Sequence, residues 1–103
     1  MALIIELNLA DPDAFYERLI ETHDRLTDAQ SLALNARAVA LLSDLIGDKK
    51  VLQEAASIAA EGLAANDGPE YDAKLLLLLA NHVGDFAQLA RVLNQARPQT
   101  AVI

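Results

Sequence analysis

The fold is decided by the stretch TDAQSLALNARAVALLSDLIGD, residues 27–48. It opens with Thr27 and Gln30, the two ends of a capping box in which each side chain satisfies a backbone N–H of the first helical turn. Leucine and alanine then recur at three- and four-residue spacing, the period of an amphipathic helix. Gly47 suits the left-handed residue that ends such a helix, and Asp48 is a preferred N-cap for the next one. The stretch therefore predicts a long helix followed at once by a second.

The same start and stop signals recur along the rest of the chain. Asp11 and Pro12 mark a helix start, because proline at the first helical position removes no helix hydrogen bond. Gly84 and Asp85 repeat the glycine stop and aspartate start described above. We therefore predict an all-α fold of four or five short antiparallel helices, stacked as helical hairpins. Their expected ranges are 11–25, 28–46, 48–62, 69–84 and 85–97.

Periodicity also predicts which side chains face the core. The helix over 28–46 carries alanine, valine and isoleucine well beyond one face, so we expect it to be central. On the helix over 11–25, Glu21 stands four residues before Arg25 and is placed to pair with it. The residues of this helix expected to face inward are Phe15, Leu19, Ile20 and His23.

Both ends of the chain carry β-prone residues. Apolar residues alternate from Leu3 to Leu9, which is a strand pattern of period two, and residues 100–103 are also β-prone. A lone strand cannot satisfy its own backbone. The N-terminal strand therefore pairs with the other end, pairs across a dimer, or is disordered. We divide the single helical domain, residues 1–103, into an arm (1–10), a helical core (11–97) and a tail (98–103).

Composition and charge restrict the classes of partner. The 103 residues are 53% hydrophobic and only 4% aromatic, which favours packed helices and leaves few rings for stacking on bases. The formal net charge is -7, and the eight Lys and Arg residues form no basic patch. We therefore expect no nucleic-acid partner, and a basic or mixed-charge protein fits better.

Membrane insertion and secretion are also disfavoured. The longest uninterrupted apolar run, Leu75 to Ala80, is far shorter than the roughly 20 residues that span a bilayer. The N-terminus lacks the basic region of a secretion signal, and Glu6 interrupts its apolar residues. We expect a cytoplasmic protein that does not bind membranes.

The sequence shows no recognisable catalytic or metal-binding constellation. There is no cysteine, and His23 and His82 stand on different predicted helices, without the spacing of helical metal sites. Glu17, Glu21 and Asp24 form an acidic stripe on one helix face, whereas a catalytic carboxylate pair needs a cleft that gives its members different environments. We expect no enzyme activity and no catalytic, metal-binding or cofactor-binding residues.

An internal repeat is suggested at an offset of 37 residues. When residues 34–57 are laid on residues 71–94, the two Gly-Asp turns coincide and six of the 24 pairs are identical. A chain rich in alanine and leucine also produces several such matches by chance. In structural terms, the repeat predicts two helical hairpins, each with a glycine that ends one helix and an aspartate that begins the next.

A run of five leucines predicts self-association. These leucines point in every direction around the helix expected over 69–84, and a bundle of 103 residues has difficulty covering all of them. We therefore expect a twofold homodimer. The residues predicted to form its interface are Leu75, Leu76, Leu77, Leu78 and Leu79.

Three segments resemble a family of short, uncharacterised proteobacterial helical domains, whose pattern runs L-A-D-P-D-x-F-Y, N-A-R and L-L-A-N-H-x-G-D. The matching residues here are 9–16, 35–37 and 78–85. The third match lies in the second half of the chain, while residues 42–48 hold the place expected for it, which favours a duplication. The resemblance supplies no catalytic residues. It implies an accessory role beside an oxidoreductase of aromatic-compound metabolism.

These observations favour a non-catalytic protein–protein interaction or accessory module. Two alternatives stay open: a carrier or sensor of a small apolar ligand, with its pocket between leucine-rich helices, and a metalloenzyme that uses histidines and carboxylates. For the interaction module, we expect the partner surface on the first helix, where mixed charge accompanies an aromatic ring. Its residues are Tyr16, Glu17, Glu21 and Asp24.

Overall fold

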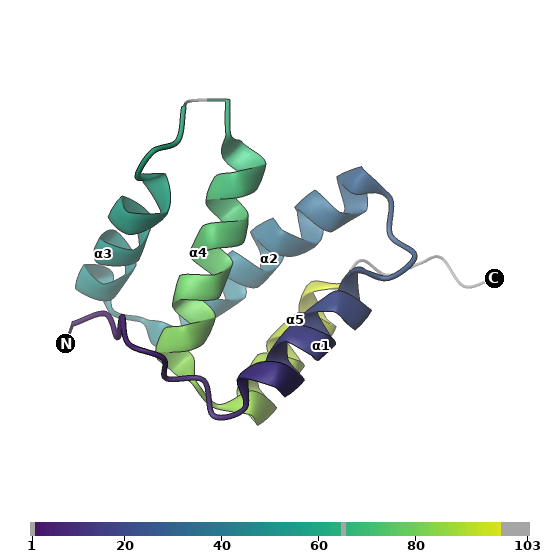
Figure 1. The fold of residues 1–103 in the computed structure, drawn as a ribbon, viewed down its shortest axis with the longest axis horizontal. Helices are drawn as coiled ribbons and strands as arrows, with labels where there is room; N and C mark the ends of the chain where they lie inside the picture. Colours follow the sequence, from purple (N-terminus) through teal and green to yellow (C-terminus); the bar gives the residue numbers. More distant parts are fainter. Residues whose placement is uncertain (1, 65, 98–103) are drawn as a thin grey trace.

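The computed structural model describes residues 2–64 and 66–97, and in these residues the chain forms five α-helices and no strand (Figure 1). The prediction of an all-α fold is therefore confirmed. Within the same residues, no helix is both long enough and apolar enough to cross a membrane. The helices are α1 (Pro12–His23), α2 (Asp28–Ile46), α3 (Lys49–Ala60), α4 (Gly68–Val83) and α5 (Phe86–Ala96).

Four helices begin at the caps that the sequence predicts. In each case a side-chain oxygen of the cap accepts a backbone N–H two or three residues further on. Asp67, before α4, instead accepts the N–H of Ala64 at 2.9 Å and so closes the loop between α3 and α4. The capping residues of α1, α2, α3 and α5 are Asp11, Thr27, Asp48 and Asp85.

The end of α1 differs from the prediction. The helix stops at His23, because Asp24 is extended and Arg25 has a positive φ of 64°. Arg25 therefore lies outside the helix, and the predicted pair with Glu21 does not form. The Arg25 Nε atom lies 3.9 Å from an Asp24 carboxylate oxygen instead. Both side chains are largely exposed, so this pair contributes little stability.

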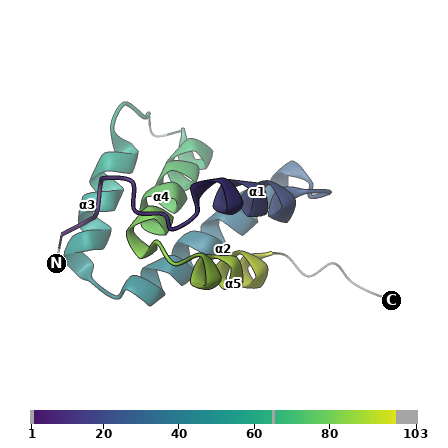
Figure 2. The same ribbon diagram turned by 60° about the horizontal axis from the view of Figure 1, so that its bottom comes forward.

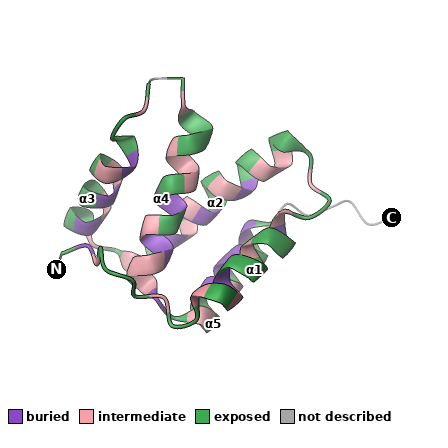
Figure 3. Ribbon diagram, in the orientation of Figure 1, coloured by how far each residue is buried: buried purple, intermediate pink, exposed green. Residues whose placement is uncertain are grey.

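The core is built around α4, which packs against α2, α3 and α5 (Figures 1 and 2). The α3 and α4 helices lie side by side, and α1 packs along α5. The α2 and α4 helices share the central position that is predicted for α2 alone. Figure 3 shows exposed as well as buried residues along α2. Its Ala36 and Ala40 are exposed. The largest fully buried side chains are Phe15, Leu34, Leu42, Val51, Leu76, Leu79, Leu89 and Leu93.

The face that α1 buries is narrower than its periodicity predicts. Phe15 and Thr22, two turns apart on one side of the helix, are buried, whereas Ile20 is 72% exposed. The prediction that Ile20 faces the core is wrong, because α1 packs chiefly on α5 and its opposite side stays uncovered. The buried Thr22 hydroxyl is satisfied, since it donates to the carbonyl of Arg18.

The N-terminal arm is not a strand. Residues 3–10 run across the C-terminal end of α4 (Figure 1). Side chains of α4, rather than a second strand, bind several of their backbone groups. The predicted N-terminal strand is therefore wrong, and the β-prone residues 100–103 lie outside the described part of the chain.

Candidate functional site

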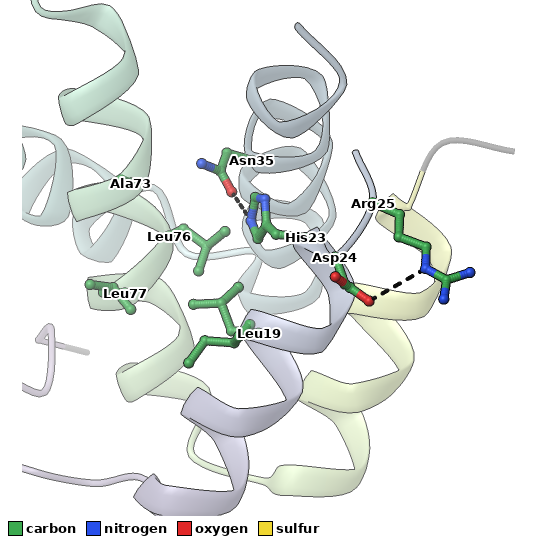
Figure 4. Close-up of a pocket in the computed structure, with 9 residues that line it drawn as sticks. Leu19, His23, Asp24, Arg25, Asn35, Ala73, Leu76 and Leu77 are labelled. Atoms are coloured by element: carbon green, nitrogen blue, oxygen red, sulfur yellow. Dashed lines mark hydrogen bonds and ion pairs between the residues drawn. The ribbon is translucent and has the colours of Figure 1, made fainter. Parts of the chain in front are cut away.

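A groove opens between α1 and α4, with a side chain of α2 between them (Figure 4). Its volume is about 580 Å³, which lies within the range of about 300 to 1,000 Å³ that is usual for ligand pockets. Apolar side chains dominate the lining. The lining residues are Leu19, Ile20, His23, Asp24, Arg25, Asn35, Ala73, Leu76 and Leu77.

Exposed apolar side chains gather at this groove. Ile20 of α1 and Leu77 of α4, which is 38% exposed, line it from opposite walls. Tyr16 lies one turn before Ile20, and Leu32 lies one turn before Asn35 on α2. Tyr16 and Leu32 are each 45% exposed. Exposed apolar side chains on two walls of one groove, as at Ile20 and Leu77, are typical of binding sites on soluble proteins.

One hydrogen-bonded pair interrupts the apolar lining. The Nε2 atom of His23 lies 3.0 Å from the Oδ1 atom of Asn35. Because an amide oxygen can only accept, the imidazole donates through Nε2. The Asn35 Nδ2 atom points away from His23 (Figure 4). No hydrogen bond among the described residues uses Nδ2, so its two N–H donors are available to an occupant of the groove.

The structure divides the predicted partner surface between two sides of α1. Tyr16, Glu17, Glu21 and Asp24 are all exposed. Asp24 lines the groove, and Tyr16 and Glu17 precede Ile20 by one turn. Glu21 lies away from the groove, in a smaller and more polar pocket of about 240 Å³. The other residues of that pocket are Arg18, Thr22, Asn94 and Arg97.

The chain covers most of its five consecutive leucines with its own helices. Leu75, Leu76 and Leu79 are buried, and Leu78 is half-buried. The exposure expected for this run is limited to one residue, because α2, α3 and α5 surround α4 and cover the other leucines. Only Leu77 remains exposed, and it lies in the groove.

The two histidines occupy separate environments. His23 binds Asn35 at the groove, whereas the Nδ1 atom of His82 accepts the N–H of Ile4 at 3.0 Å. Within residues 2–64 and 66–97, no three side chains of the metal-ligating types His, Cys, Asp and Glu come together as a metal site would require. Each imidazole is therefore hydrogen-bonded to another residue of the chain.

Residues at the end of α4 hold the N-terminal arm, and the sequence does not predict this contact. The Asn81 side chain accepts the N–H of Asn8 at 2.8 Å and donates to the carbonyls of Ile4 and Glu6, at 3.2 and 2.9 Å. The Asn8 side chain donates in return to the carbonyls of Asn81 and His82. The Asn81 side chain thus binds the backbone of the arm, and the Asn8 side chain of the arm binds the backbone of α4.

The path of the arm also requires a glycine at position 84. Gly84 has a φ of +75°, and a Cβ atom there would lie 2.7 Å from the backbone oxygen of Asn8. The carbonyl of Gly84 accepts the N–H of Ala10 at 3.0 Å. The segment over 78–85 was visible in the sequence as a motif, but the motif alone does not show which distant residues it contacts.

Comparison with known proteins gives one result. A family model described as a protein of unknown function, DUF2783, matches residues 3–61 and again residues 58–98. Two successive matches are consistent with an internal duplication, as are the positive φ values of Gly47 and Gly84 before two capping aspartates. No curated protein and no solved structure matches the chain. Since the first match covers more than half of the sequence, the chain belongs to the DUF2783 family.

Proposed function

We propose that the chain is a non-catalytic interaction module, which receives an apolar segment of a partner protein in the groove between α1 and α4. The observation that carries this proposal is the exposure of Ile20 and Leu77 on opposite walls of one groove. Removing such apolar surface from water is favourable by about 25 cal/mol per Å². The chain gains nothing in its own stability from leaving these side chains uncovered, whereas association covers them.

The net charge bears on the choice of occupant. Two copies of a chain with a formal charge of -7 repel each other, and a partner with basic residues is attracted. Asp24 in the lining of the groove is paired with Arg25, and Glu17, three residues before Ile20 on α1, carries the same sign as the whole chain. A different, basic protein is therefore favoured over a second copy. A homodimer through Leu77 is the competing outcome.

Photo-crosslinking in the native host tests the proposal. A benzoylphenylalanine residue replaces Ile20 or Leu77 in the groove, or Leu45 as an exposed apolar control on α2 outside the groove. We expect one crosslinked partner from both groove positions and none from Leu45. An adduct of twice the chain mass would show the homodimer instead. Equal labelling at all three positions, or labelling at none, would contradict the proposed use of the groove.

We further propose that the module acts as a cytoplasmic accessory protein. The sequence resemblance supports a partner among the oxidoreductases of aromatic-compound metabolism. Mass spectrometry of the crosslinked partner tests this point directly. Identification of a protein from another class would leave the interaction module standing and would reject the oxidoreductase.

The volume of the groove favours a second candidate function, the binding of a small apolar ligand. A ligand that binds only the folded chain raises its melting temperature. We would measure thermal shifts with a panel of small apolar compounds, using the wild-type chain and Leu77→Glu. A shift that Leu77→Glu abolishes would favour the ligand carrier. No shift with any compound would reject it.

A further inference from the structure

We propose, on the basis of the function proposed above, that Asn35 determines the specificity of the groove. Oriented by His23, it would bind a single hydrogen-bond acceptor on the apolar face of a partner helix. The observation behind this proposal is the direction of the Asn35 amide. Its oxygen is held by the His23 Nε2–H at 3.0 Å, and its nitrogen points away from that ring (Figure 4).

The walls of the groove suit a helix. Leu19 and His23 are four residues apart on α1, and Ala73 and Leu77 are four residues apart on α4. Each pair forms part of an i, i+4 ridge, and ridges of this kind pack against the side-chain rows of another helix. An amphipathic helix in an apolar groove is a recurrent mode of recognition. A helical occupant therefore uses both walls at once.

Charge complementarity indicates which helix fits. Glu17 and Asp24 stand on the α1 side of the groove, and Glu70 lies about two helical turns before Leu77 on α4. Arg25 lines the groove and pairs with Asp24 at 3.9 Å, and Lys74 lies three residues before Leu77, so the preference for a basic helix rests on Glu17, Glu70 and the net charge of -7. The expected occupant is the amphipathic helix of another protein, with lysine or arginine on the edges of its apolar face.

Asn35 then discriminates among such helices. A helix that covers Asn35 without offering an acceptor leaves a buried N–H donor without a partner, which is costly. We expect this helix to bind about tenfold more weakly, or worse, than one with an acceptor at the same place. A single polar residue in an apolar helix seam sets register in the same way.

His23 determines that Asn35 presents a hydrogen-bond donor, and not an acceptor, to the occupant. Without the His23 Nε2–H, the Asn35 amide could turn and present its oxygen, and it would then receive donors as well as acceptors. His23 is therefore a positioning residue, which acts on the occupant through Asn35. Its conservative replacement is glutamine, whose side-chain N–H can take the place of the imidazole N–H.

Selection from a displayed library of helical peptides, each about 16 residues or about 24 Å long, tests the proposal. The intact chain is the bait, and peptides that also bind Leu77→Glu are removed. We expect the selected peptides to carry apolar residues at helical spacing, lysine or arginine at the edges, and one Gln, Asn, Ser or Glu within the apolar face. Selection on Asn35→Leu should remove that polar residue. Asn94→Leu, an exposed asparagine on α5 outside the groove, is the matched control and should select the wild-type set.

The His23 variants separate positioning from a merely structural role. His23→Gln should select the wild-type set, whereas His23→Ala should accept donors and acceptors alike at the central position. Thermal unfolding verifies that each bait is folded. If Asn35→Leu does not fold, Asn35→Asp has nearly the same shape but no side-chain donor, and it should select a donor such as lysine or serine.

The outcomes distinguish this proposal from the proposed function. If Asn35→Leu or Asn35→Asp selects the same peptides as the wild type, the role of Asn35 is rejected while the groove remains a binding site. If the wild-type bait enriches no peptide beyond those that Leu77→Glu also binds, the role of Asn35 and the proposed binding function of the groove are both rejected. Enrichment of acidic edges in place of basic ones would overturn the expected chemistry of the partner.

Discussion

Gly84 shows how one residue fixes the path of the N-terminal arm. Gly84 and Gly62 share a φ of +75°, but a Cβ atom at Gly62 would meet nothing within 4 Å, whereas one at Gly84 would meet the backbone of Asn8. Gly62→Ala therefore adds only the strain of the left-handed conformation, roughly 1 kcal/mol. Gly84→Ala also places a side chain at a positive φ, and it must in addition displace the arm.

We expect Gly84→Ala to lower the free energy of unfolding by about 2 kcal/mol or more, and Gly62→Ala by about half of that. Urea unfolding of the two variants measures the difference, and Gly62→Ala is the control for the backbone strain. Equal losses would show that the contact between Gly84 and the arm does not contribute to stability.

Among the contacts of the N-terminal arm, one side chain of α4 makes more hydrogen bonds to the arm's backbone than any other. Asn81 makes three hydrogen bonds to the backbone of residues 4, 6 and 8. Asn81→Ala removes all three, so we expect the Asn8 amide to lose its protection from hydrogen exchange and the free energy of unfolding to fall by about 1 to 3 kcal/mol. Asn94→Ala, on the exposed side of α5, should leave both quantities unchanged. Unaltered exchange at Asn8 in Asn81→Ala would show that the arm is held by other contacts.

The long helix α2 depends on its capping box. The Thr27 hydroxyl accepts the Gln30 N–H, and the Gln30 side chain accepts the Thr27 N–H, at 3.1 and 3.0 Å. Thr27→Ala should lower the free energy of unfolding by about 1 kcal/mol, whereas Thr27→Ser retains the hydroxyl and should cost only a few tenths. Thermal or urea unfolding compares the two. A loss of the same size in both variants would show that the methyl group, and not the cap, is responsible.

The helices could be predicted because their signals are local. Asp11, Thr27, Asp48 and Asp85 cap the turns that immediately follow them, so a short window of sequence contains both partners of each bond. The arm could not be predicted in the same way. An alternating apolar segment reads as a strand, and nothing near it in sequence shows that α4 will bind its backbone.

The groove could not be predicted from the sequence, because α4 lies far along the chain from α1 and α2, with which it forms the groove. The apolar period of α1 includes Ile20 as readily as Phe15, and only the packing of α1 on α5 leaves Ile20 exposed. Likewise, five leucines in a row do not show which one stays outside, and the structure leaves Leu77. The part of the predicted partner surface that the groove includes is Asp24, with Tyr16 and Glu17 at its edge.

The affinity for the crosslinked partner shows whether the groove is the binding surface of the chain. We would measure the Kd of that partner for the wild type, for Leu77→Glu in the groove, and for Leu45→Glu as an exposed leucine outside it. A carboxylate in the groove has to be desolvated on binding, so Leu77→Glu should weaken binding at least about tenfold. Leu45→Glu should leave the Kd unchanged, and both variants should melt within a few degrees of the wild type. Equal affinity of all three chains for the partner would show that the groove is not the binding surface.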